Sequence, residues 1–493
     1  MGRASTRRAG AARPAVPGAR VTDTAVALFT SDLRLHDNPV LGGALRGADA
    51  VVPLFVRDTG VGAAGFDVPN RRAFLADCLA DLGAELRRRG GRLVLRSGDV
   101  VAETCRVARQ AGARDVHVAA GVSGYAQRRA ERLAAALASD GVRLHVHEGV
   151  VTALPPGALT PQGKDHYAVF TPYFRRWSAQ EHPKPAAAPR RVPVPDGVAS
   201  EPLPEGRDDI AGTSPGLAAG GERAGRRALS GWLAGGLDAY ADRQDDLAGN
   251  GTSRLSPHLH FGTLSAAEVV FRARARGGAG ADAFVRQLAW RDFHHQVLAA
   301  RPAAAHEDYR TRHDRWRRAP READAWRQGR TGYPVVDAAM RQLRYEGWMP
   351  GRARLLVASF LTKTLYVDWR VGARHFLDWL VDGDLANNQL NWQWAAGTGT
   401  DTRPHRVLNP LVQARRFDPD GSYVRRWVPE LADIQDAAGA AGGAVHRPWL
   451  LRDDGGSDGG RGGRHRGGTA RYPDPIVDLA TGHDRFRTAR GLE

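Results

Sequence analysis

One stretch of the sequence places a carboxylate, an amide and an indole at helical spacing. Asp384, Asn388 and Trp392 follow one another at intervals of four residues, so a helix would carry all three on one face. A carboxylate and an amide can hydrogen-bond the edge of a polar heteroaromatic ring, and an adjacent indole can pass an electron to that ring. A capped helix with aromatic core residues is the simpler alternative, but so dense a polar and aromatic cluster favours a binding site.

A second candidate is Thr252–Pro257, where hydroxyl side chains precede an expected helix. Hydroxyl groups and free backbone N–H groups at a helix N-terminus can bind phosphate. Taken alone, this segment is better explained as an ordinary helix start, with Ser256 as the N-cap and Pro257 in the first helical position.

Basic and aromatic residues are interleaved in two further stretches. Ala289–His295 combines Trp290 with Arg291, and residues 310–330 contain eight arginines and two tryptophans. Such mixtures suit phosphate contacts together with base stacking. A solvated charged face is the alternative for the second stretch.

Other chemistries lack their motifs. No histidine pair has the spacing and partners of a zinc site, so we expect no metal. The chain contains no Walker loop. Gly60–Gly65 spells G-x-G-x-x-G, but it follows the second expected strand and does not open a helix. We therefore interpret it as a flexible loop and not as a dinucleotide site.

The elements that must position these residues fall into two classes. Before residue 150, short apolar runs alternate with amphipathic ones, which predicts βαβ units and a Rossmann-like, doubly wound parallel sheet. Ligands of such sheets lie at the carboxyl ends of the strands, where the loop Ser31–Arg34 would be. The expected strands are Ala25–Phe29, Ala50–Val56, Arg92–Leu95, Asp115–Ala119 and Arg143–His147, and the expected helices are Asn70–Arg89, Val101–Ala111 and Ser123–Ser139.

Composition divides the whole chain. Eleven of the twelve tryptophans follow residue 225, where the apolar residues take on helical period, so an all-α C-terminal domain is expected. The predicted parts are a disordered arm (1–21), an α/β domain (22–150), a connector (151–224), the helical domain (225–434), a mobile Gly/Arg-rich insertion (435–470) and a C-terminal segment (471–493) that contains a short helix.

Length, composition and charge bound the class of protein. With 493 residues and 42% hydrophobic residues, the chain suits a globular protein of two or three domains. No apolar stretch is long enough to span a membrane, and two cysteines suit a reducing cytoplasm. The net charge of +16 suggests a polyanionic partner, nucleic acid first. However, only three of the 70 basic residues are lysines, a bias that a GC-rich genome would also produce.

Several long motifs resemble those of the photolyase/cryptochrome family, in the family's order, over about residues 24–432 and again from Tyr472. They are Ala27–Pro39, Thr252–Pro257, Trp290–Phe293, Thr331–Leu343 and Asp382–Trp394. Within the family, Ala386–Trp394 and Gly397–Thr402 are most similar to actinobacterial class I cyclobutane pyrimidine dimer photolyases.

The resemblance implies an antenna domain, a helical domain that holds a U-shaped FAD, and light-driven DNA repair. Excited FADH⁻ would pass an electron to a dimer flipped out of UV-damaged DNA, the cyclobutane ring would split, and the electron would return. We expect a cytoplasmic monomer with no membrane association. The antenna is expected to be 8-hydroxy-5-deazaflavin, with methenyltetrahydrofolate as the alternative, near Ser31–Arg34.

The resemblance also implies roles for single residues. Arg354 would pair with Asp382, and Asn388 would face flavin N5. Electrons that reduce oxidised flavin would pass along Trp392, Trp369 and Trp316, from the flavin to the surface. The implied FAD-binding residues are Tyr240, Thr252, Ser253, Arg254, Leu255, Ser256, Arg291, Arg354, Asp382, Gly383, Asp384 and Asn388. The implied DNA- or lesion-binding residues are Gln287, Trp290, Arg291, Gly351, Arg352, Trp394 and Gln413.

Two positions depart from the family's pattern. Pro350 and Gly351 stand where the family usually has His-Asn, and that Asn contacts flavin and lesion edges. We therefore expect weaker lesion binding without loss of flavin. Gln287 stands where many cyclobutane enzymes have Glu, and an amide cannot donate a proton as an acid does. The alternatives are a cryptochrome-like photoreceptor without repair activity and a (6-4) photolyase; the paired His of (6-4) enzymes is absent.

Overall fold

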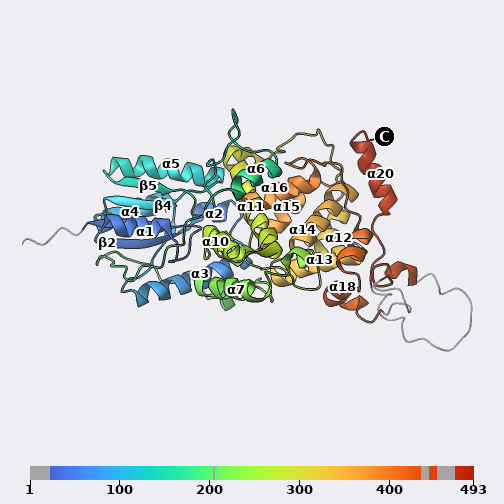
Figure 1. Cartoon of the computed structure of the whole chain (residues 1–493), viewed down its shortest axis with the longest axis horizontal. Coiled ribbons are helices and arrows are strands. Elements are labelled where there is room, and N and C mark those ends of the chain that lie inside the picture. The colour runs from blue at the N-terminus through green and yellow to red at the C-terminus, as the bar shows by residue number, and fades with distance from the viewer. Residues whose placement is uncertain (1–22, 204–205, 435–442, 452–471, 493) are drawn as a thin grey trace, which may run out of the picture.

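The computed structural model describes residues 23–203, 206–434, 443–451 and 472–492. Figure 1 shows an α/β part that contains the sheet and, beside it, a helical part that contains most of the remaining chain. The predicted arm 1–21 and most of the predicted insertion 435–470 lie outside the described residues. Among the helices of the described ranges, none is both long and apolar enough to cross a membrane.

Five parallel strands form one sheet, in the order β3-β2-β1-β4-β5. The chain moves outward from the central strand β1 to one edge and then returns to build the other, so the sheet is doubly wound, as expected. Every residue of β1 is buried, which explains its uninterrupted apolar sequence. The strands are β1 (Thr24–Phe29), β2 (Ala50–Asp58), β3 (Val94–Gly98), β4 (Asp115–Ala119) and β5 (Arg143–His147).

The three helices expected between the strands are present. They are α3 (Pro69–Arg88), α4 (Val100–Ala111) and α5 (Gly124–Ser139). The structure adds α1 (Pro39–Gly47), which begins where the Asn38 side chain accepts a hydrogen bond from the N–H of Leu41. The loop interpretation of Gly60–Gly65 was wrong, because α2 (Thr59–Ala63) forms a short helix there, with Asp58 as its N-cap.

The helices of the helical part pack around two apolar clusters. The buried rings of Trp326, Trp369 and Trp392 belong to one cluster, and those of Trp232, Tyr240 and Phe293 belong to the other. The helices of this part are α7 (Glu222–Gly235), α8 (Tyr240–Arg243), α9 (Ser256–His260), α10 (Ala266–Arg276), α11 (Gly278–Ala300), α12 (Pro320–Gln328), α13 (Pro334–Glu346), α14 (Gly351–Ser359), α15 (Trp369–Trp379), α16 (Leu385–Ala396), α17 (Pro410–Phe417), α18 (Ser422–Trp427) and α20 (Leu479–Ala489). A π-helical turn, η3 (Phe360–Thr364), follows α14.

The segment between the two parts lies against both. It contains α6 (Phe170–Ser178), and further along it the N–H of Val192 donates to the carbonyl of Arg89. At the start of α7, the carboxylate of Glu222 accepts hydrogen bonds from the N–H groups of Leu35 and His36, at 2.8 and 3.0 Å. The loop after β1 is therefore tied directly to the helical part.

Candidate functional site

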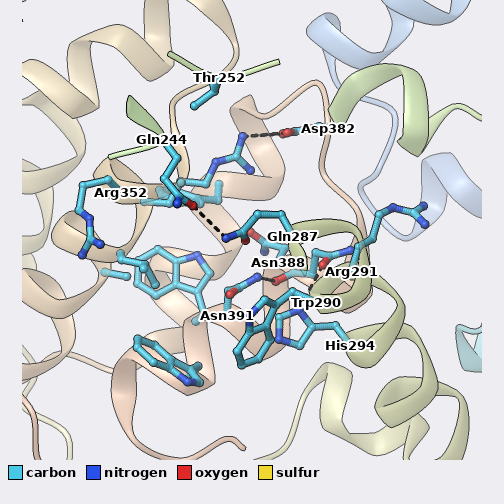
Figure 2. A pocket seen from close by; sticks show the side chains of 18 of the residues that line it. Gln244, Thr252, Gln287, Trp290, Arg291, His294, Arg352, Asp382, Asn388 and Asn391 are labelled. Carbon is cyan, nitrogen blue, oxygen red and sulfur yellow. Dashed lines mark hydrogen bonds and ion pairs between the residues drawn. The ribbon is translucent and has the colours of Figure 1, made fainter. Parts of the chain in front are cut away.

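The helical part contains a cavity of about 490 Å³, within the size range of small-molecule sites. Side chains of α8, α11, α14 and α16 line it, together with Thr252 and Asp382. Figure 2 shows these side chains converging from separate helices. The lining mixes amides, charged groups and indoles, so it can bind a ligand that is both polar and aromatic.

Arg354 and Asp382 form an ion pair in the cavity wall. The Nη2 atom of Arg354 lies 2.8 Å from one carboxylate oxygen and 3.1 Å from the other, and its Nε donates to the carbonyl of Met349. The Asp382 side chain is buried. The expected pair is therefore present, and it offers a fixed cation and a fixed acceptor at the same edge of the cavity. Whether they contact a flavin stays a prediction.

Gly383 and Asp384 directly follow Asp382 in the sequence. Asp384 is the N-cap of α16 and accepts from the N–H of Asn387 at 2.7 Å, while His295 Nε2 lies 3.1 Å from its other oxygen. Although burial favours the neutral acid, the nearby His295 and Arg291 hold the pKa of Asp384 well below its usual range. Asp384 and Gly383 are not among the residues that line the cavity, and their predicted contact with FAD stays a prediction.

Asn388 and Trp392 face the cavity from α16. The Asn388 amide nitrogen donates to the carbonyl of Ala373 and to Gln389 Oε1, at 3.0 and 3.1 Å. Both of its N–H groups are thus used within the protein, and the carbonyl oxygen is the group that can accept from a ligand. The Trp392 ring is 2% exposed, and its buried Nε1 has no hydrogen-bond partner within the described part of the chain.

The Trp392 ring packs directly on α15. A Cβ atom at Gly372 would lie only 2.1 Å from the indole, so the close contact requires glycine at this position. Gly372 lies three residues after Trp369 on the same helix, and the Trp369 ring is fully buried. Trp316 is only partly buried. Trp316 is therefore the most exposed of the three tryptophans, and the expected electron path stays a prediction.

The rest of the cavity lining comes from α11, α14 and the end of α16. Trp290 stacks on Phe170 with ring centroids 3.7 Å apart, and Trp394 lines the same cavity. Exposed Gln287 donates to Gln244, as Figure 2 shows. Arg352 is held by Asp245 at 2.6 Å. These side chains offer two indole faces, an amide and a cation to a second group that shares the cavity.

Gly351 lies beside them, and no heavy atom would come within 4 Å of a Cβ built on it. It is the first residue of α14, and Pro350 precedes it as the N-cap residue without a side-chain cap. The position that carries Asn in the family is thus open space at the cavity here.

The segment expected to bind phosphate reaches the cavity only through Thr252. Leu255 is buried among apolar residues, and the N-cap interpretation of Ser256 was wrong: α9 begins at Ser256, follows Leu255, and has no side-chain cap. Ser256 Oγ instead accepts from Trp348 Nε1 at 3.0 Å. Arg254 pairs with Glu346 across 3.1 Å.

Three other expected residues have defined surroundings. Tyr240 lines the cavity from α8. Arg291 lines it too, but its guanidinium donates to the carbonyls of Val151 and Leu259, at 2.6 and 3.2 Å. Gln413 on α17 is buried and does not line the cavity. Its predicted contact with DNA has no support from this geometry and stays a prediction, as does that of Arg291.

Sequence reasoning missed several residues that line the cavity. Gln244 and Asp245 hold Gln287 and Arg352, and they follow the single turn of α8, which has no periodic signal. Phe376 lies on the buried face of α15, and its ring centroid is 4.9 Å from that of Trp392. Asp242, Asp245 and Asp246, spread over the six residues after Tyr240, were the available signal for Asp245. The other unpredicted lining residues are His294, Leu355, Ala358, Asn387 and Asn391.

Known proteins match both parts of the chain. A family model described as DNA photolyase matches residues 25–192, and one described as the FAD binding domain of DNA photolyase matches residues 284–490. The fold and the cavity thus define a protein with an α/β domain followed by a helical flavin-binding domain. The chain belongs to the DNA photolyase family.

Individual relatives agree with this assignment. A deoxyribodipyrimidine photo-lyase of Streptomyces griseus is 64% identical over 470 residues, which cover 95% of this chain and 99% of the relative. The Escherichia coli protein of the same name is 34% identical over 470 residues, which cover 91% of this chain and 94% of the relative. A class III photolyase from Agrobacterium tumefaciens has a similar structure, with a TM-score of 0.86, 32% identity, and coverage of 97% of this chain and 99% of that one.

Proposed function

We propose that this protein splits cyclobutane pyrimidine dimers in UV-damaged DNA in a light-driven reaction that uses FAD. The observation that carries the proposal is that one cavity combines the Arg354–Asp382 pair, Asn388 and Trp392 with Trp290, Trp394 and Gln287. The first group suits a flavin, and the second suits a flipped lesion. The names of the Streptomyces griseus and Escherichia coli relatives support the same activity.

The residues present fit a flavin. When bound, reduced FAD would supply the electron that light excites. The carbonyl oxygen of Asn388 can accept from a ring N–H, because the amide nitrogen is already engaged, and the buried Trp392 Nε1 lacks an acceptor within the described part of the chain. Arg354 would hold negative charge on the ring in place, because Asp382 fixes its guanidinium.

The lesion would enter beside the flavin. Trp290 and Trp394 would provide faces for the two pyrimidines, and Gln287 would donate to a carbonyl. Arg352 would contact a phosphate, since a planar guanidinium suits that group, although it would have to release Asp245. A dimer pairs poorly with the opposite strand, so taking it out of the stack costs less than flipping an intact base.

The test is direct. The purified protein is reduced and mixed with an oligonucleotide that carries one thymine cyclobutane dimer, and ultraviolet absorbance of the restored thymines is followed under blue light and in the dark. Light-dependent recovery is expected. Absence of recovery while flavin is bound and reduced contradicts the proposal, and an oligonucleotide with a (6-4) lesion then tests the (6-4) alternative.

We also propose that an antenna pigment binds at the carboxyl edge of the sheet, with 8-hydroxy-5-deazaflavin preferred over methenyltetrahydrofolate. Asp32 and Arg34 are buried in the loop after β1, and the buried Arg129 Nε has no hydrogen-bond partner among the described residues. A guanidinium with an unused N–H suits the acidic hydroxyl of the deazaflavin.

The antenna proposal is tested by reconstitution. Each pigment is added to the protein, and the excitation spectrum of repair is compared with the pigment's absorption. FAD is a third pigment to test, because a Sulfolobus tokodaii photolyase structure, 30% identical, is described as having two FAD molecules, with the implication of a novel light-harvesting cofactor. If the deazaflavin does not extend the excitation spectrum, the preferred antenna is wrong.

A photoreceptor is the second candidate function. Pro350-Gly351 replaces a lesion-contacting Asn of the family, and a Synechocystis cryptochrome shares the fold with a TM-score of 0.83 and 28% identity, covering 96% of this chain and 99% of that one. The photorepair experiment separates the two, because a receptor would bind and reduce flavin without restoring thymines. We further propose a monomer in the cytoplasm, which size-exclusion chromatography and cell fractionation test.

A further inference from the structure

A tyrosine contacts the outermost of the three tryptophans. The Tyr366 ring lies with its centroid 4.9 Å from that of Trp316, and the ring planes are inclined by 40°. Rings in direct contact can exchange an electron in one step. Tyr366 is 2% exposed, whereas Trp316 is partly exposed, so the tyrosine is the better shielded of the two.

Tyr366 is held in an unusual backbone conformation. Its φ is +57°, the left-handed region that a bulky side chain rarely adopts. The residue directly follows the π-helical turn η3 and Leu365, and its carbonyl accepts from the N–H of Arg317 at 2.9 Å. Strained residues of this kind are over-represented at functional sites. Here the strain places the phenol against the segment that carries Trp316.

A proton acceptor lies next to the phenol. Tyr366 Oη donates to Asp314 Oδ1 at 2.8 Å. The Asp314 side chain is 1% exposed and receives two hydrogen bonds from Arg490, at 2.5 and 2.8 Å. Burial and the Asp314 carboxylate raise the pKa of Tyr366 to about 12, so the phenol is protonated and donates at neutral pH. Oxidation of a phenol makes it strongly acidic, and its proton would then move along this hydrogen bond.

We propose that Tyr366 is a further electron donor, which reduces oxidised Trp316 while its phenolic proton passes to Asp314. The Trp316 radical cation gains one electron and becomes neutral tryptophan. Tyr366 loses one electron and one proton and becomes a neutral tyrosyl radical. The Asp314 carboxylate gains that proton, so net charge is unchanged. This inference rests on the proposed function, because the oxidised tryptophan arises only if Trp392, Trp369 and Trp316 reduce a photoexcited flavin.

The step has a consequence for charge separation. A radical cation at Trp316 lies near solvent and can take an electron back from the reduced flavin, which undoes the charge separation. A neutral radical at Tyr366 can take that electron back only if the proton returns from Asp314 at the same time. The tyrosine therefore makes light-driven reduction of the cofactor longer lived, whereas the lesion-splitting reaction of already reduced enzyme does not need it.

The test is a laser flash on the holoenzyme with oxidised FAD and no DNA, followed by transient absorption and by electron paramagnetic resonance of frozen samples. In the unmodified protein we expect the tryptophan radical to decay as a tyrosyl radical forms, more slowly in D₂O than in H₂O. Tyr366→Phe should leave the initial flavin reduction unchanged, abolish the tyrosyl signal and prolong the tryptophan radical. Repair by chemically reduced enzyme should be unaffected.

Tyr333→Phe is the matched control. Tyr333 is also buried, and its phenol donates to a backbone carbonyl, that of Val477, but not to a carboxylate. Its removal should leave the tyrosyl signal unchanged. Trp316→Phe should remove that signal, because the electron then has no adjacent acceptor. A tyrosyl signal that survives in Tyr366→Phe, or the absence of one in the unmodified protein despite normal flavin reduction, overturns the inference alone. Absence of flavin photoreduction in the unmodified protein counts against the electron path of the proposed function as well.

Discussion

Arg71 of the α/β domain donates a hydrogen bond of 3.0 Å to the carbonyl of Leu380, two residues before Asp382 in the cavity wall. The same guanidinium atom donates to the carbonyl of Leu377 at 2.6 Å, and Nε donates to Phe66. A residue of α3 therefore holds the loop between α15 and α16. Through this contact the α/β domain helps to fix the carboxylate that orients Arg354.

Substitution Arg71→Met should loosen that loop without touching the cavity. Removing the guanidinium leaves buried carbonyls without donors, so the free energy of unfolding should fall by about 3 kcal/mol. The dissociation constant of FAD should rise, because Asp382 is less well held. Flavin retained after dialysis measures the effect. Arg72→Met, at the exposed neighbouring position, is the control, and equal flavin loss from both variants contradicts the role of Arg71.

Gly351→Asn should strengthen binding of a cyclobutane dimer. The position opens on the cavity with nothing within 4 Å of an added Cβ. One new hydrogen bond is worth about 1 kcal/mol, so the affinity for a dimer-containing oligonucleotide should rise about fivefold while that for FAD is unchanged. Fluorescence anisotropy gives both values. Gly231→Asn on α7, where a Cβ also meets nothing, controls for the substitution itself. Unchanged affinity for the dimer refutes the prediction.

Trp369→Phe should separate reduction of the flavin from repair. Trp369 is buried, and its indole donates to Asp308, so phenylalanine preserves most of the packing but is far harder to oxidise. Photoreduction of oxidised flavin should slow about tenfold or more, a barrier increase of at least ~1.4 kcal/mol, while chemically reduced enzyme repairs normally. Trp379→Phe, on the same helix, should change neither rate. Equal loss of both activities would mean that the substitution acts through the fold.

Asp418 should make the protein less stable as pH rises from about 4 to about 7. Its side chain is fully buried, and burial raises the pKa to about 7 although the N–H groups of Tyr423 and Val424 donate to it. The folded protein therefore keeps a proton that the unfolded chain releases above about pH 4. This stabilisation is complete below pH 4 and is lost by about pH 7, on the order of 4 kcal/mol.

The comparison of Asp418→Asn with the unmodified protein checks the direction of this pH dependence. Urea unfolding at pH 5 and pH 8 should show a smaller loss of stability in the variant, because the amide is neutral throughout. Asp420→Asn should keep most of the pH dependence, because burial is the main cause of the raised pKa of Asp418 and the neighbouring Asp420 adds less; the pKa of exposed Asp420 is lowered, so it titrates below this range. An unchanged slope in Asp418→Asn would mean that another group carries it.

The sheet was predictable because its signal is local. The observed bounds of β4 and β5 coincide with the expected ranges, and α3 begins and ends one residue from them. Helix α1 was missed because three glycines dilute its nine residues, and only Asn38 and Pro39 indicate a helix start. Helix α2 is one short turn. Glycine has a low helix propensity, so the glycines of α2 favour a loop when only the local sequence is considered.

The site was only partly predictable. The cavity residues of α16 lie in the long motif Asp382–Trp394, so a family resemblance locates them. Arg71 could not be found, because its role depends on a contact with a residue 309 positions away. Nor could Gln287's partner Gln244, since a hydrogen bond between two amides depends on how α8 and α11 approach each other. Such contacts are determined by packing, which single residues and their spacing do not reveal.

The contact between Tyr472 and Asp337 bears on how this protein is made. The Tyr472 phenol donates to the Asp337 carboxylate, which also receives the N–H groups of Thr331 and Gly332, and 135 positions separate the two partners. At 5–20 residues per second, the ribosome needs roughly 7 to 30 seconds to pass from one to the other. The α/β domain can fold during synthesis, whereas the helical domain cannot complete the hydrogen bonds of Asp337 until Tyr472 has been made.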